Sequence, residues 1–144
     1  MQDKKIGIVS SRFNPEVTQK LFDGTFIRLR ESGIAESQIT SIWVPGAIEI
    51  PLAAQRLAMT NQYAAIICLG AVIMGETKHF EYVCQQVSYG CQKVALTQNI
   101  PVIFGVLTTQ TEEQALDRVG GKHGHMGQYA ADSALELIKI FSSI

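Results

Sequence analysis

The sequence predicts one α/β domain in which parallel strands alternate with helices. Four short apolar runs, rich in β-branched side chains, have the length of buried strands. Each run is followed by a segment with apolar residues at spacings of three and four, as expected for a helix that packs on a sheet. No linker, repeat or low-complexity stretch divides residues 1–144, and 47% of the residues are hydrophobic, enough for one sizeable core.

The first half of the chain contains two strand–helix units. KIGIVS at Lys5–Ser10 predicts the first strand. Asn14, which precedes a proline, predicts the N-cap of a helix that Gly33 closes. ITSIWV at Ile39–Val44 predicts the second strand, and a helix is expected over Ile48–Met59. Both units therefore follow the strand–turn–helix pattern of a parallel sheet.

The second half repeats this pattern and ends on two helices. Its expected elements are a strand over Ala64–Leu69 that Gly70 ends, a helix from about Phe80 to Gln98, a strand over Val102–Leu107, a short helix over Glu112–Val119, a glycine-rich link over Gly120–Gly127, and a last helix over Gln128–Phe141. With right-handed crossovers, this order gives a three-layer α/β/α sandwich of the flavodoxin-like class, with a four-stranded parallel sheet.

Composition excludes several kinds of partner. The net charge is −1 without a basic block, so no nucleic acid is expected. No apolar run approaches the ~20 residues of a membrane span, and the N-terminus lacks the apolar region of a signal peptide. The three cysteines, Cys68, Cys84 and Cys91, form no CxxC motif and suggest reduced thiols. We therefore expect a cytoplasmic protein that does not bind membranes.

Functional side chains gather in the loops that follow the predicted strands. In a parallel sheet these loops emerge at one edge, where open α/β sheets bind their ligands. The four loops are Ser11–Pro15, Pro45–Glu49, Gly70–His79 and Leu107–Thr111. The third leads into a helix N-terminus, which favours phosphate, and it places His79 where a proton can be moved near neutral pH.

The residues alone leave a second interpretation open for each candidate. Phe13 either stacks on a flat ring or plugs the sheet edge, and Glu49 either binds a ligand or complements a helix dipole. Thr77 either holds a phosphate or caps a helix, and His79 is either a proton carrier or an ordinary surface histidine. Arg118 either clamps a phosphate or lies on a solvated helix face.

Other common site types find little support. His123 and His125 are two residues apart, but without acidic or cysteine partners they are a weak signal, and no metal is expected. The chain has neither a P-loop nor a Gly-x-Gly-x-x-Gly motif. Nucleoside triphosphates and dinucleotides therefore lose support as ligands.

Five stretches spread over nearly the whole chain form a specific set. They are RFN at Arg12–Asn14, WVPGAIEIPLAA at Trp43–Ala54, LGAVIMGETKHFEYV at Leu69–Val83, IPVIFGVLTT at Ile100–Thr109 and EQALDRVGGKHG at Glu113–Gly124. In this order and spacing they resemble the 6,7-dimethyl-8-ribityllumazine synthase family, which catalyses the penultimate step of riboflavin biosynthesis. Any one stretch would be a weak signal, whereas the set is highly specific.

The resemblance implies a transferase with two small-molecule substrates. It would join 5-amino-6-(D-ribitylamino)uracil to 3,4-dihydroxy-2-butanone 4-phosphate and release 6,7-dimethyl-8-ribityllumazine, phosphate and water. It would need no metal and no organic cofactor. The resemblance further implies a homo-oligomer built from pentamers (single, paired or in a hollow icosahedral shell), active sites shared between subunits, and riboflavin synthase as a partner protein.

The resemblance also assigns roles to site residues. His79 would be catalytic, as the proton donor and acceptor, and Phe104 would cover the pyrimidine from the neighbouring subunit. The other implied contacts are to the pyrimidine and ribityl chain by Phe13, Ala47, Ile48, Glu49, Ala71, Val72 and Ile73, and to the phosphate by Glu76, Thr77, Arg118 and Lys122.

Some positions depart from the family's usual pattern. Met126 stands where a lysine is usual and Met74 where an arginine is often found. Lys78 replaces a small polar residue, and Ile48 replaces an aromatic one. The N-terminal tail, Met1–Lys4, is short for the extra strand that many members pair with a neighbouring subunit.

Two other functions fit the same fold. The replacement of two basic residues by Met126 and Met74 would suit a carrier or sensor that binds a lumazine or flavin without turnover. The chain retains Phe13, Glu49, Thr77, His79 and Arg118, which favours the enzyme, because a pure ring binder needs neither phosphate nor proton groups. A structural shell protein is the third hypothesis, and particle size alone would not separate it from an active shell.

Overall fold

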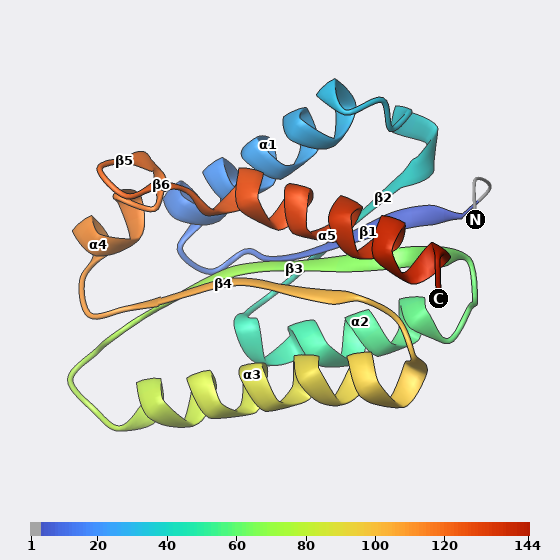
Figure 1. Ribbon diagram of the computed structural model, residues 1–144. Helices are drawn as coiled ribbons and strands as arrows, with labels where there is room; N and C mark the ends of the chain where they lie inside the picture. Colours follow the sequence, from blue (N-terminus) through green and yellow to red (C-terminus); the bar gives the residue numbers. More distant parts are fainter. Residues whose placement is uncertain (1–3) are drawn as a thin grey trace.

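The computed structural model describes residues 4–144 and shows a three-layer sandwich around one parallel sheet (Figure 1). The sheet contains β1 (Lys5–Ser11), β2 (Ile39–Val44), β3 (Tyr63–Ile73) and β4 (Val102–Thr109), in the order β2-β1-β3-β4. All three pairings are parallel. The predicted flavodoxin-like α/β class is therefore confirmed.

Two pairs of helices cover the two faces of the sheet (Figure 1). Helices α1 (Pro15–Glu31) and α5 (Met126–Ser142) lie on one face, and α2 (Ile50–Ala58) and α3 (His79–Gln98) lie on the other. Short helical segments, η1 (Glu36–Gln38), η2 (Ala47–Glu49) and α4 (Glu112–Leu116), lie in the connections. Side chains of each strand alternate between the faces, so Ile6 and Ile8 pack with α1 and α5 while Val9 packs with α2 and α3.

Strand β3 runs through the middle of the core and is longer than the sequence predicted. We expected Gly70 to end this strand, but Gly70 pairs with Val106 and the pairing continues to Ile73. The space that a Cβ atom of Gly70 would fill is taken by the Ser11 hydroxyl, which would lie 2.8 Å from it. The glycine is thus a close-packing position within the strand, and the connection to α3 shortens to residues 74–78.

The glycine-rich link after β4 also differs from the expectation. The short helix predicted over residues 112–119 ends at Leu116, and β5 (Val119–Gly121) and β6 (Gly124–His125) form an antiparallel hairpin. Gly120 and Gly124 adopt φ of 101° and 84°, which side chains rarely tolerate. Likewise, β4 extends to Thr109, so the first part of the expected loop at residues 107–111 is strand.

The sequence also raised expectations about the cysteines, membrane spans and the N-terminal tail. Cys68, Cys84 and Cys91 are all free thiols. Among the described residues, no helix combines the length and apolar character needed to cross a membrane. The expectation for the N-terminal tail concerns Met1–Lys4, and its first three residues lie outside the described part of the chain.

Candidate functional site

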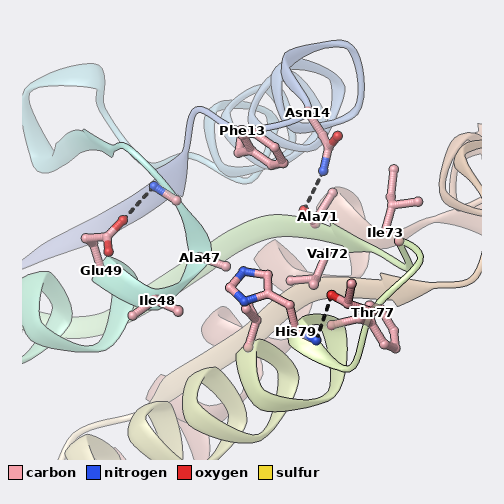
Figure 2. A pocket seen from close by; sticks show the side chains of 14 residues that line it. Phe13, Asn14, Ala47, Ile48, Glu49, Ala71, Val72, Ile73, Thr77 and His79 are labelled. Atoms are coloured by element: carbon pink, nitrogen blue, oxygen red, sulfur yellow. Dashed lines mark hydrogen bonds between the residues drawn. The ribbon is translucent and has the colours of Figure 1, made fainter.

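The carboxyl ends of β1, β2 and β3 surround a cavity of about 320 Å³, here called the strand-end cavity (Figure 2). Its volume is in the range typical of small-molecule sites. Nine of the residues predicted for the site line it: Phe13, Ala47, Ile48, Glu49, Ala71, Val72, Ile73, Thr77 and His79. Three of the four predicted loops therefore converge, as the parallel topology requires.

Phe13 offers an aromatic face to this cavity. It follows β1, lines the strand-end cavity and is 71% exposed. A plug over the sheet edge would be buried, so the structure removes that interpretation of Phe13. An exposed ring beside an apolar cavity can stack on a planar ligand.

Glu49 closes the turn after β2 and also lines the cavity. One of its carboxylate oxygens, Oε1, accepts a hydrogen bond of 2.8 Å from the backbone N–H of Gly46 (Figure 2). The bond closes the turn of η2 and engages one of the two carboxylate oxygens. Glu49 therefore has a local capping role that the sequence analysis did not predict, and its position on the cavity also allows contact with a ligand.

Thr77 and His79 lie at the N-terminus of α3. The N-cap residue is Lys78, whose side chain makes no capping bond, and the backbone N–H of His79 donates a hydrogen bond of 3.3 Å to Thr77 Oγ1. The hydroxyl of Thr77 keeps its own hydrogen for a further acceptor. The His79 ring points toward Ala47 and Val72 (Figure 2), and Glu49 and His79 are the residues with titratable side chains among those lining this cavity.

Phe104 and Arg118 line a different cavity, of about 630 Å³, here called the edge cavity. It lies beside β4, an edge strand of the sheet, and includes Gln114 and Met126. Neither Phe104 nor Arg118 lines the strand-end cavity of its own chain. The fourth predicted loop, residues 107–111, contributes to this second cavity.

The remaining predicted residues lie outside both cavities. Glu76 is exposed in the connection to α3, and Lys122 is exposed at the turn of the β5–β6 hairpin. Neither is among the lining residues of either cavity. Glu76 is adjacent in sequence to Thr77, so its backbone is near the helix N-terminus.

The two histidines of the hairpin face different surroundings. His123 lines the edge cavity. His125 packs against Gly24 of α1, and its Nδ1 accepts a hydrogen bond of 3.1 Å from the backbone N–H of Gly127. Within residues 4–144 no group of three histidine, cysteine or acidic side chains comes together as a metal cluster would require.

Sequence reasoning missed several lining residues. Gly46, Phe80 and Val83 line the strand-end cavity, as does Asn14. The apolar residues were interpreted as helix core, and the helical spacing gave no reason to separate core from cavity. Asn14 was predicted as an N-cap, and it holds that position, but its side chain makes no capping bond.

Comparison with known proteins gives one consistent result. A family model described as 6,7-dimethyl-8-ribityllumazine synthase matches residues 3–142. Proteins named 6,7-dimethyl-8-ribityllumazine synthase from three strains of Coxiella burnetii are each 56% identical over 140 residues, which cover 97% of this chain and 93% of theirs. The match includes the residues that line both cavities.

Proposed function

The chain belongs to the 6,7-dimethyl-8-ribityllumazine synthase family and condenses 5-amino-6-(D-ribitylamino)uracil with 3,4-dihydroxy-2-butanone 4-phosphate, and we propose that its strand-end cavity and edge cavity form the two halves of the active site. The observation that carries this proposal is the convergence of nine predicted residues on one cavity while Phe104 and Arg118 line another. A site split in this way is completed by a neighbouring subunit.

The strand-end cavity is proposed to bind the pyrimidine substrate. Phe13 stacks on the pyrimidine ring, and residues 71–73, at the end of β3, border it on the sheet side. Residues 47–49 hold the ribityl chain through backbone groups and the Glu49 carboxylate. This division follows the lining of the cavity, which is apolar around the ring and carries its acidic group at the η2 turn.

The phosphate is proposed to bind where the two halves meet. The N-terminus of α3, a helix of 20 residues, provides a partial positive charge and unpaired N–H groups. Glu76 contributes its backbone and Thr77 its hydroxyl, while Arg118 of a neighbouring subunit pairs with the anion bidentately. Lys122 adds a more distant positive charge. Phe104 of that neighbour covers the pyrimidine ring from the second side.

His79 is proposed to move the protons of the reaction. The uracil amine attacks the ketone, and the resulting carbinolamine loses water to form an imine, which requires a proton donor. Elimination of phosphate leaves its charge on groups that are already in place, Arg118 and the helix N-terminus. Ring closure then follows from proximity of the two bound molecules. His79 is the imidazole among the lining residues of the strand-end cavity, and imidazole is the side chain most often used as a general acid and base.

Oligomerisation is supported by apolar side chains on the surface of α3. Tyr82, Tyr89 and Leu96 are 61%, 68% and 74% exposed and recur every seven residues, so they form one stripe along the helix. We propose that residues 1–144 form one domain that assembles into pentamers. Riboflavin synthase, which uses the product, is the proposed partner, and the proposed location is the cytoplasm.

Product formation tests the function directly. The purified protein is mixed with both substrates, and lumazine absorbance is followed against a control without protein, because the condensation also proceeds unaided. Product well above that control, and reduced in Arg118→Ala when the phosphate substrate is limiting, supports the enzyme. No excess product, with tight pyrimidine or flavin binding in the same preparation, would support a carrier instead.

A further inference from the structure

We infer that His123 is a second phosphate-binding side chain beside Arg118, and that its protonation makes phosphate binding depend on pH. His123 and Arg118 both line the edge cavity. They come from the two ends of one short connection, because Arg118 precedes β5 and His123 precedes β6. The inference rests on the proposed function, since it adds a residue to the phosphate half of that site.

The hairpin geometry holds these two residues on the same side of the fold. The backbone N–H of His123 donates a hydrogen bond of 2.9 Å to the carbonyl of Asp117, the residue before Arg118. The backbone N–H of Met126 donates one of 2.6 Å to the carbonyl of Arg118 itself. Both bonds fasten the hairpin to the end of α4, so the backbones of His123 and Arg118 are held together beside the cavity that both line.

The net charge of the edge cavity depends on whether His123 is protonated. Among the lining residues, Arg118 is positive and Asp117 is negative, and the others apart from His123 are uncharged. Counted as formal charges, Arg118 and Asp117 sum to zero, so protonation of His123 would add one net positive charge to the cavity. A phosphate dianion forms stronger hydrogen bonds with a charged donor than with a neutral one, and histidine as a residue type can gain such a charge near neutral pH.

The side chains of His123 and Arg118 are both available for an anion. Both are exposed, and the one ion pair found among residues 4–144 joins Arg28 to Asp132. The Asp117 carboxylate lies against Gly121, where an added Cβ atom would approach its Oδ1 to 3.1 Å. The acidic group is therefore turned toward the hairpin backbone.

Other titratable groups near the hairpin differ from His123 in position. Lys122 lies beside it at the turn but does not line the cavity. The Tyr129 hydroxyl of α5 lies against Gly124, and His125 faces Gly24 of α1. The other imidazole of the hairpin is His125, and of the two only His123 lines the edge cavity.

Sulfate inhibition separates the protonation of His123 from that of the ligand, because sulfate remains a dianion between pH 6 and 8.5. The measured quantity is the inhibition constant of sulfate against the butanone phosphate substrate. For the unaltered protein we expect sulfate to bind about tenfold more tightly at pH 6 than at pH 8.5, the effect of one charge-assisted hydrogen bond.

Three variants identify the source of this pH dependence. His123→Gln should weaken sulfate about tenfold at pH 6 and less than about twofold at pH 8.5. His123→Lys should keep tight binding at both pH values, because lysine stays charged. Lys122→Gln should change sulfate binding by the same factor at both. Any effect of His79 is common to all of these proteins, so it cancels in the comparison.

Two results would overturn different parts of the account. If the unaltered protein and His123→Gln show equal pH dependence of sulfate inhibition, the role of His123 is wrong. The phosphate site itself still stands in that case, provided that Arg118→Ala weakens sulfate binding at both pH values. If Arg118→Ala leaves sulfate inhibition unchanged, the phosphate half of the proposed site is itself wrong. The two failures are therefore distinguishable.

Discussion

The side-chain amide of Asn14 donates a hydrogen bond of 2.8 Å to the backbone carbonyl of Ala71, which is 57 residues away (Figure 2). Asn14 adopts φ of 61° and ψ of 58°, so its backbone is left-handed. This bond ties the loop after β1 to the end of β3, and thereby fixes the position of Phe13 relative to the floor of the strand-end cavity. The left-handed backbone is therefore part of how the site is built.

Two variants of Asn14 separate the effect of its hydrogen bond to Ala71 from the effect of its left-handed backbone conformation. Asn14→Gly tolerates the left-handed conformation and removes the bond, so we expect a loss of about 1 kcal/mol in the free energy of unfolding and a higher KM for the pyrimidine. Asn14→Ala adds backbone strain and should lose a further ~1 kcal/mol. Denaturation at matched protein concentration measures both. A glycine variant with unchanged stability and KM would contradict a positioning role.

Replacing His79 should slow turnover while pyrimidine binding is kept. We expect His79→Ala and His79→Gln to lower kcat by roughly ten- to a thousand-fold, the size of a general acid–base contribution. The KM for the pyrimidine should change little, because Phe13 and residues 71–73 remain in place. Steady-state kinetics with both substrates varied gives the two constants. Unchanged turnover would remove His79 from the mechanism.

Replacing Arg118 should affect the two substrates differently. Arg118→Ala is expected to raise the KM of the phosphate substrate by at least about tenfold and that of the pyrimidine by less than about threefold. Arg118→Lys keeps the charge without the bidentate geometry and should lie between. Equal losses for both substrates would mean that Arg118 supports the fold and does not bind phosphate.

His125 should make stability depend on pH. Burial lowers the pKa of His125, so protonation is easier in the unfolded chain, and its stabilising contribution is present above about pH 6.5 and is lost as the pH falls through the folded pKa. The neutral ring accepts the N–H of Gly127, a bond that protonation of Nδ1 breaks. His125→Asn keeps an N-cap acceptor without titration, so its melting temperature should fall less between pH 7 and 5.5. Parallel pH profiles would contradict this account.

The sequence predicted the strands more accurately than the connections. All four strands of the main sheet begin within a residue of their predicted starts, because apolar runs bounded by turn residues carry strong local signals. Gly70 was wrongly interpreted as the end of its strand. It is a glycine because the Ser11 hydroxyl of the neighbouring strand occupies the space that a side chain would need, and this contact is visible only in the tertiary structure. Strands β5 and β6 have three and two residues, too few for periodicity to detect.

The candidate site was predicted as a set of residues but not as two cavities. Local signals place Phe13, Glu49 and His79 in loops that share one edge of the sheet. They do not place Arg118, because its position depends on the hairpin that follows α4. Asn14 shows the same limit, since its partner is a backbone carbonyl on a distant strand. Contacts between elements therefore account for most of what sequence reasoning missed.

Activity in mixed oligomers tests most directly whether two subunits share each site. His79→Ala and Arg118→Ala chains, carrying different affinity tags, are co-expressed in equal amounts, and the mixed oligomers are purified through both tags. If the strand-end cavity of one chain meets the edge cavity of the next in a ring, about a quarter of the interfaces combine two intact halves. We predict about a quarter of the unaltered activity, well above either single variant. Activity no higher than that of the two variants alone would show that His79 and Arg118 act within one chain, and it would contradict the shared site.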